Sequence, residues 1–259
     1  MIKFFRHIRQ SLIMKNRTGK YFKYAIGEIV LVVIGILIAL QINNWNENRK
    51  NQVIEIKVLK ELLVDLEASF LDLENDISVI KFRIEISENI KTHIHLKKPA
   101  TDSVLINLFI VSNTTQFSPR ISGYENLKSV GLNAITNDTL RKQITDIYEK
   151  WFSISVMEGR EYDKYDNPTK DLTPLLGKYI IVDMNNSTEI NYRESSYKLK
   201  TNATKFKNYE QFLEDDFLFS KIQKTIYDRA SKISLYELTK SRTKRLIAAI
   251  NKEIKKLEG

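Results

Sequence analysis

The sequence predicts an all-α protein, in which one N-terminal transmembrane helix continues into a long helix and a long antiparallel C-terminal helix closes a helical ectodomain. Three observations lead to this fold class. One uninterrupted apolar run lies near the N-terminus, and two long segments with helical periodicity flank a mixed middle region. Only 8 Gly and 4 Pro occur in 259 residues. So few turn-forming residues are uncommon in sandwiches and barrels, which favours helices.

Residues 1–24 are predicted to form a cytoplasmic basic amphipathic segment. They carry seven Lys and Arg and no Asp or Glu. Their apolar residues have helical spacing, which fits a short helix on the cytoplasmic leaflet as well as a plain topogenic segment. The positive-inside rule keeps such a segment in the cytoplasm and sends the following chain across the membrane.

Residues 25–44 are predicted to be the transmembrane helix. The apolar run Ala25–Ile42 covers roughly 27 Å as a helix, enough for the hydrocarbon core. It is longer than the core of a signal peptide, and no small-x-small cleavage site follows it. Basic residues on one side and aromatic residues at both ends distinguish it from a buried core helix. We therefore expect a single-pass protein of the bacterial inner membrane, with the bulk of the chain in the periplasm.

The charge distribution excludes nucleic acid as an expected partner. The formal net charge is +9, but without the seven basic residues of the first segment 34 Lys and Arg face 32 Asp and Glu. The excess lies where it contacts membrane lipid. The chain has no cysteine, so packing alone must hold an extracytoplasmic domain together.

Residues 45–98 are predicted to form a long stalk, a coiled-coil-like helix. From Ile56 to Ile84, apolar residues recur at alternating steps of three and four, and no Pro or Gly falls between Gly35 and Pro99. Additional apolar residues widen this stripe, so the pattern fits a bundle helix as well as a two-stranded coiled coil. These additional residues are Ile54, Val58 and Leu62.

Residues 209–259 are predicted to form the long C-terminal helix. The stretch Glu61–Asp76 of the stalk carries six acids and no base, whereas Lys240–Lys256 carries seven bases and one acid. We expect the two helices to pack antiparallel, with facing residue numbers that total about 310, a length-based estimate. Asp65 would then face the basic stretch as an exposed charge, and its removal would cost under about 1 kcal/mol.

Residues 99–208 are predicted to be a helical middle region with loops. Ser122–Glu125 has the form of a capping box at the start of a short helix, which Gly131 closes. Asn137 or Asp138 caps the next helix. The predicted buried seam of that helix consists of Leu140, Ile144, Ile147, Trp151 and Ile154.

The end of this region is less regular. Pro168 and Pro174 interrupt the helical pattern. The apolar residues 179–182 fit either a short strand or a buried helical turn, and residues 185–187 have the composition of a loop.

Two segments resemble the signatures of a known family. The first is Tyr24–Glu47, YAIGEIVLVVIGILIALQINNWNE, and the second is Tyr124–Arg141, YENLKSVGLNAITNDTLR, followed by Ile147-Tyr148-Glu149. They resemble a Bacteroidota family of uncharacterised single-pass membrane proteins, a domain of unknown function. The resemblance implies the topology and the class of protein, and no reaction.

Glu28, Gly35 and Ala39 are the candidate site residues, as a helix–helix interface. A carboxylate within a membrane span suggests a functional site, and these residues share one helical face, where Gly35 and Ala39 form a small-xxx-small contact. The alternative is that Glu28 extends towards Lys23 or Lys20 at the interface. One carboxylate does not make a proton relay.

No other segment predicts a chemical site. His93 and His95 point apart on a helix, so a solvated role is expected rather than a metal site. Trp151 and Phe152 are expected to pack in a core. Phosphate-loop, nucleophile-elbow and zinc-protease motifs do not occur, so no catalytic residue, cofactor or metal is predicted.

The functional hypothesis is therefore a membrane-anchored helical ectodomain that acts by protein–protein interaction in the cell envelope, without catalysis. Its partner would be an unknown protein or a second copy of the chain. The alternative is a ligand-sensing input module that works through a separate signalling partner, because the 24-residue cytoplasmic segment is too short for an output domain. An enzyme of unrecognised type is the third hypothesis.

Overall fold

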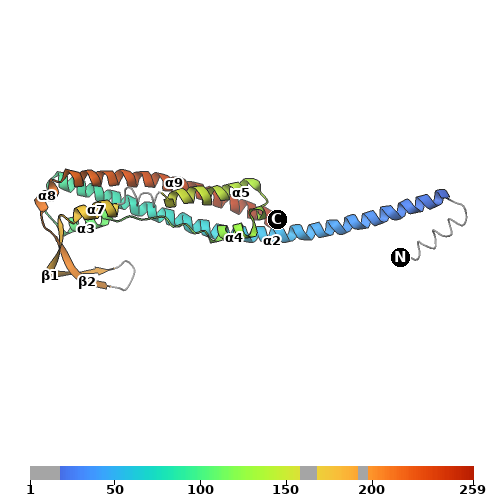
Figure 1. Ribbon diagram of the computed structural model, residues 1–259, viewed down its shortest axis with the longest axis horizontal. Helices are drawn as coiled ribbons and strands as arrows, with labels where there is room; N and C mark the ends of the chain where they lie inside the picture. Colours follow the sequence, from blue (N-terminus) through green and yellow to red (C-terminus); the bar gives the residue numbers. More distant parts are fainter. Residues whose placement is uncertain (1–17, 158–167, 192–197) are drawn as a thin grey trace. The chain divides into compact units, whose positions relative to one another are not determined.

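The computed structural model describes residues 18–157, 168–191 and 198–259, and it confirms the mostly all-α class (Figure 1). The predicted basic segment lies largely outside these residues. The helices are α2 (Thr18–His95), α3 (Asp102–Ser112), α4 (Ser122–Val130), η1 (Leu132–Ala134), α5 (Asp138–Thr145), η2 (Asp146–Phe152), α7 (Pro168–Leu176), α8 (Tyr209–Leu213) and α9 (Asp216–Glu258). The strands are β1 (Ile180–Asn191) and β2 (Lys198–Phe206).

Helix α2 runs without interruption from Thr18 to His95, as the absence of a breaker predicts. By length and composition, its apolar part from Ala25 onwards is able to cross a membrane. The chain divides into two compact units, residues 1–57 and 58–259. In the first unit, the described side chains of the apolar run are mostly exposed, and the second unit holds all of the remaining elements.

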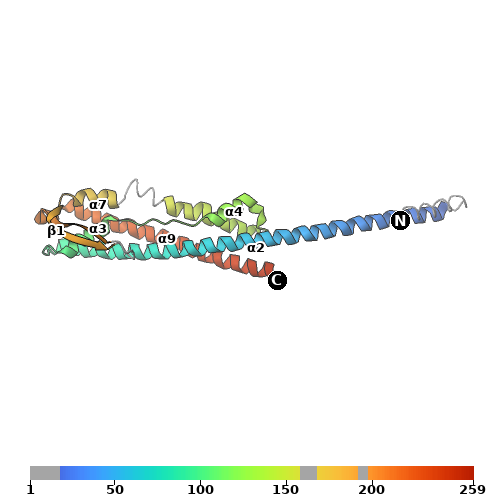
Figure 2. The same cartoon turned by 90° about the horizontal axis from the view of Figure 1, so that it is seen from below.

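In the second unit, α2 and α9 lie side by side and antiparallel (Figures 1 and 2). Three ion pairs fix the register: Lys60–Glu258 at 2.7 Å, Glu74–Lys240 at 3.8 Å and Lys81–Glu237 at 3.6 Å. The residue numbers of each pair total 314 to 318. The predicted hairpin is confirmed, and the predicted register is wrong by four to eight residues. The last turn of α9 meets α2 at Lys60, beyond the position near Val53 that equal helix lengths suggested.

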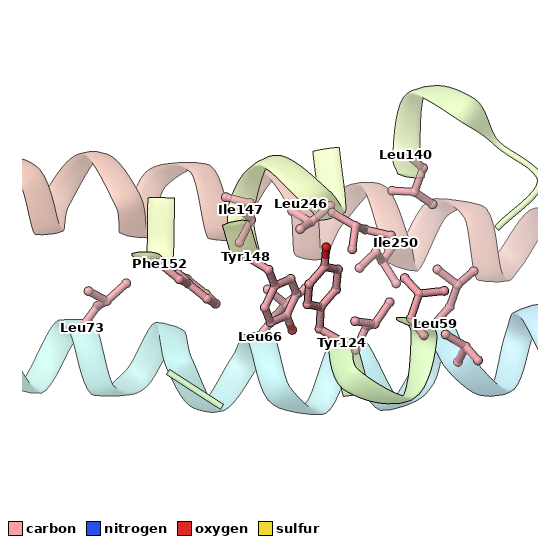
Figure 3. Close-up of a cluster of buried hydrophobic side chains, with 14 of the residues drawn as sticks. Leu59, Leu66, Leu73, Tyr124, Leu140, Ile147, Tyr148, Phe152, Leu246 and Ile250 are labelled. Carbon is pink, nitrogen blue, oxygen red and sulfur yellow. The ribbon is translucent and has the colours of Figure 1, made fainter. Parts of the chain in front are cut away.

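Two hydrophobic clusters lie along the second unit. The first joins α2 and α9 to α4, α5 and η2 (Figure 3), and the second joins them to α3, α7, α8 and the strands. Central members of the first cluster are Leu59, Leu66, Leu73, Tyr124, Ile147, Tyr148, Phe152, Tyr236, Leu246 and Ile250. Central members of the second are Ile90, Leu108, Val111, Leu172, Tyr179, Phe212 and Ile222. Burial of this apolar surface is the main stabilising contribution to the fold.

Arg229 lies on α9 between the two clusters and is only 5% exposed. Its guanidinium donates hydrogen bonds to the hydroxyl of Ser87 at 3.1 Å and to the carbonyl oxygens of Val111 and Asn113 at 2.6 and 2.9 Å. Burial and, to a smaller extent, the charge of the nearby Arg83 together lower the pKa of Arg229 to about 10. The side chain therefore stays charged at neutral pH and ties α9 to α2 and to the end of α3.

A hairpin of β1 and β2 is the main departure from the predicted helical middle region. The strands pair antiparallel from Ile180–Phe206 to Asp183–Ala203, and pairing resumes at Ser187–Asn202. Residues 179–182 were open between strand and helical turn, and most of them form the start of β1. The predicted loop at 185–187 is wrong, because these residues belong to β1. They lie where the register of the strand pair shifts, between Asp183 and Ser187.

We expect a zero-length carbodiimide to join Lys60 to Glu258 and Lys81 to Glu237 within one chain, since both pairs are exposed ion pairs. Mass spectrometry of the full-length protein in detergent, with light and heavy isotope-labelled chains mixed, separates intrachain from interchain products. The K81R variant should lose only the second crosslink, because arginine forms no stable amide. A dominant interchain product would contradict the intramolecular hairpin.

Candidate functional site

The predicted interface residues all lie on α2 in the first unit. Ala39 is exposed, Glu28 is partly exposed, and a Cβ added at Gly35 would meet no atom within 4 Å. The structure contains a single chain, so a contact of this face with another helix stays a prediction.

The histidine pair has a different environment from the one expected. His95 is exposed, but the ring of His93 lies 2.5 Å from the Tyr209 hydroxyl, which donates to the Lys98 carbonyl oxygen at 2.7 Å. Burial lowers the pKa of His93, and the charge of Lys98 lowers it further. Among the described residues, no group of three potential ligands is placed to hold a metal ion.

The most constrained constellation is the junction at which α4 meets α2. Asp65 of α2 is 5% exposed, and its carboxylate lies at the first turn of α4. The Ser122 hydroxyl donates to it at 3.0 Å, and the Gly123 N–H donates at 2.6 Å. A carboxylate at a helix N-terminus satisfies donors that the helix leaves open and is favoured by the helix dipole. Asp65 therefore fastens α4 to α2.

Two sequence predictions fail at this junction. Ser122 does not cap its own helix, since the N-cap residue is Ile121 and no side chain bonds there. Asp65 does not face the basic stretch of α9, because its carboxylate accepts hydrogen bonds from Ser122 and Gly123 of α4. The predicted caps further along are confirmed: Gly131 ends α4 with φ of 105°, and the Asn137 side chain accepts from the amides of Thr139 and Leu140.

Asp65 belongs to a series of polar contacts that runs along one edge of α2. The amide of Asn126 donates to Glu61 at 2.5 Å, the Arg120 N–H donates to the Ser69 hydroxyl at 3.0 Å, and the Thr115 hydroxyl donates to Asp76 at 2.5 Å. The segment from Thr115 to Asn126 thus follows α2 in the antiparallel direction. These polar residues of α2 follow each other at steps of four, four and seven, which places them on one face beside the apolar stripe.

Gly123 is required for the close approach of α4 and α2. A Cβ at this position would lie 2.9 Å from the backbone carbon of Glu61 and 2.9 Å from the backbone nitrogen of Leu62. Backbone atoms of a helix do not yield as a flexible side chain does. The glycine lets the N–H of Gly123 reach the Asp65 carboxylate.

Tyr124 and Tyr148 stack at the centre of the first cluster, with ring centroids 4.5 Å apart and an interplanar angle of 3° (Figure 3). The Tyr124 hydroxyl donates to Glu149 at 2.7 Å. Burial, followed by the Glu149 carboxylate, raises the pKa of Tyr124 to about 12. Burial also raises the pKa of Tyr148, with the charge of Asp65 as the second cause. Both phenols are therefore neutral at physiological pH and act in packing.

The sequence did not reveal the π-helix η2, which directly follows α5. Its wider turn shifts the buried face, so that Phe152 and Ser155 are buried in place of the predicted Trp151 and Ile154. Phe152 packs in the core as expected, whereas Trp151 is only half-buried at its edge. The indole N–H of Trp151 donates to Asp146 at 2.8 Å, across five residues. Single π-helical turns frequently occur at functional sites.

An apolar groove of about 570 Å³ lies beside η2. On one side it is lined by the extended segment between α3 and α4, including Phe117 and Ile121. On the other side it is lined by Tyr148, Phe152 and Met157. Its described lining combines these apolar side chains with the polar residues Gln116, Ser118 and Ser153.

Comparison with known proteins gives one match. A family model described as a family of unknown function, DUF6090, matches residues 28–182, which include most of α2 and the whole α4–η2 region. Neither the curated proteins nor the solved structures contain a match to the chain.

We expect D65A to destabilise the second unit by about 2–4 kcal/mol, because the buried donors of Ser122 and Gly123 would lose a charged acceptor. This replaces the sequence-based expectation of under 1 kcal/mol. Urea unfolding of the full-length protein in detergent, followed by tryptophan fluorescence, measures the effect. The matched control is D72A, which removes an exposed acid from the same helix. Equal midpoints for the two variants would contradict the fastening role.

We expect G123A to lower the unfolding midpoint strongly, because the added Cβ would collide with the backbone of Glu61 and Leu62. G177A is the control, since its Cβ would lie 3.4 Å from the nearest atom, an ordinary contact. Thermal unfolding followed by circular dichroism at 222 nm compares the two. A midpoint for G123A equal to that of the wild type would show that α4 does not approach α2 this closely.

Proposed function

Because the chain belongs to DUF6090, a family of unknown function, its role has to come from its own residues: we propose that it is a membrane-anchored helical ectodomain that acts by protein–protein interaction in the cell envelope. The anchor is the apolar part of α2. The basic residues before it favour a cytoplasmic N-terminus and a periplasmic ectodomain in the bacterial inner membrane. The resemblance to single-pass Bacteroidota membrane proteins supports the same assignment.

The outer face of α2, defined here as Val64, Ala68, Leu71, Asn75, Ser78 and Phe82, carries the proposal. These residues follow each other at alternating steps of four and three, the spacing of a coiled-coil seam. Val64, Leu71 and Phe82 are 64%, 57% and 54% exposed. Helix α2 thus has one apolar stripe buried in the bundle and a second, partly apolar face on its solvent side, which Asn75 and Ser78 interrupt.

Acidic residues flank this outer face and indicate what kind of partner it binds. Glu67 and Asp72 are exposed on its two sides. In a parallel pair of identical α2 helices, Glu67 of one chain would approach Asp72 of the other, which is repulsive. A helix with Lys or Arg beside its own apolar seam complements both the charge and the spacing. We therefore assign the face to a basic amphipathic helix of another protein.

Site-specific photo-crosslinking in the native cells tests this assignment. A benzoyl-phenylalanine at position 71 of the full-length chain should form a heavier adduct, whose crosslinked peptide carries Lys or Arg beside an apolar seam. The double variant E67K/D72K should reduce adduct formation about fivefold or more, since each exposed ion pair contributes about 0.2–1 kcal/mol and a reversal adds repulsion.

The matched control carries the same photo-crosslinker at Tyr227, an equally exposed position on α9. It should give no such adduct. An adduct between two differently tagged copies of the chain would replace the proposed partner by self-association. The absence of any adduct from position 71, with the protein present in the membrane, would contradict a docking role for this face.

A further inference from the structure

A small cavity of about 190 Å³ lies between η2 and α9. Gln143, Asp146 and Ile147 line one side of it, and Arg242, Arg245 and Leu246 line the other. The lining thus combines two guanidinium groups, one amide and one carboxylate with apolar side chains; Arg242 is half-buried and Arg245 is exposed. The cavity is distinct from the groove beside Phe117, because the two have no lining residue in common.

Arg242 is held in place by stacking. Its guanidinium carbon lies 4.0 Å from the centre of the Trp151 ring. Asp146 accepts the hydrogen bond of the Trp151 indole at 2.8 Å, which fixes the ring. Stacking on an aromatic face orients the planar guanidinium without using its N–H donors. Arg242 is therefore positioned in advance, with its donors available to a ligand.

Those donors are not used within the part of the chain that the structure describes. The Nε of Arg242 is buried without a hydrogen-bond partner, and neither Arg242 nor Arg245 forms an ion pair or hydrogen bond with a described residue. A buried charged donor without an acceptor is expensive, and in native proteins such a group calls for an ion, a water or a ligand. Asp146 lies in the same lining, but its carboxylate accepts from the Trp151 indole and forms no ion pair or hydrogen bond with either arginine.

We infer that this cavity binds a small oxyanion, a carboxylate or a phosphate, through the guanidinium of Arg242, with Arg245 and the Gln143 amide as further donors. The planar fork of arginine matches the oxygen pair of such a group. The lining carries two positive charges and one negative charge, which leaves it net positive towards an anion. The volume of about 190 Å³ admits a short dicarboxylate or a single phosphate and is too small for a nucleotide. This inference does not depend on the proposed docking face of α2.

Trp151 makes the site directly observable. The chain has two tryptophans, so W45F leaves Trp151 as the only one. In this background, titration of the full-length protein in detergent with sodium succinate or inorganic phosphate, at constant ionic strength, should give a saturable change in tryptophan emission. R242Q should weaken binding about tenfold or more, because the charge-assisted fork is lost, and R242K should restore only part of it.

The matched control is K252Q, which removes one exposed positive charge from the same helix and should leave the titration unchanged. A competition experiment distinguishes a small free acid from the carboxylate of a peptide. Tetraglycine with a free C-terminus and tetraglycine amide are each added as competitors of succinate. Competition by the free acid alone extends the site to a peptide carboxylate, and the absence of competition restricts it to small free anions.

Two results would overturn the inference. One is a response to both anions that does not saturate, and the other is an equal response of the wild type and R242Q. If R242Q lowers the thermal midpoint of the anion-free protein, R245Q provides the second variant. Its guanidinium has no packing role against Trp151, so it should weaken the anion titration without changing that midpoint.

Discussion

The apolar stripe of α2 is the constraint on which the rest of the second unit depends. The part of α2 in this unit, residues 58–95, cannot cover its own hydrophobic side, so other elements must pack along it. Helix α9 packs along one side of this part of α2, with ion pairs from Lys60 to Lys81. The segment between Thr115 and Asn126 covers the other, held by Asp65 and its neighbouring contacts. Both segments run antiparallel to α2, which gives the second unit its hairpin arrangement.

Much of this architecture follows from the periodicity of the sequence. For the parts that periodicity does not predict, there is a physical reason. The long helices, the hairpin and the caps at Gly131 and Asn137 rest on local patterns that the sequence displays. The register does not, because the apolar seams match each other equally well when one helix slides by a turn. The buried Arg229 favours one register, because its guanidinium meets its acceptors on α2 and at the end of α3 only there, and the exposed Lys60–Glu258 pair adds little.

The candidate site could not be predicted from the sequence, because it depends on tertiary contacts that local patterns do not encode. Asp65 stands among exposed acids in the sequence, and only the folded chain distinguishes it from Asp72. Periodicity alone predicts an unbroken α-helix after Asn137, whereas η2 inserts a π-turn that buries Phe152 and turns Trp151 to the edge of the core. That rotation brings Trp151 under the guanidinium of Arg242. The charged cavity is therefore a product of an irregularity that no local propensity encodes.

The arginine cavity and the part of α2 that lies in the second unit are connected by a continuous set of contacts. Trp151 and Tyr148 both lie on η2, Tyr148 stacks on Tyr124 of α4, and the first turn of α4 is fastened to Asp65 of α2. The connection consists of one ring stack, one charge-assisted hydrogen bond and the backbones of η2 and α4. Close-packed interiors transmit displacement rather than absorb it. The family model matches residues 28–182, which contain the η2 side of the cavity and its connection to α2, whereas the arginines of α9 lie outside the matched region.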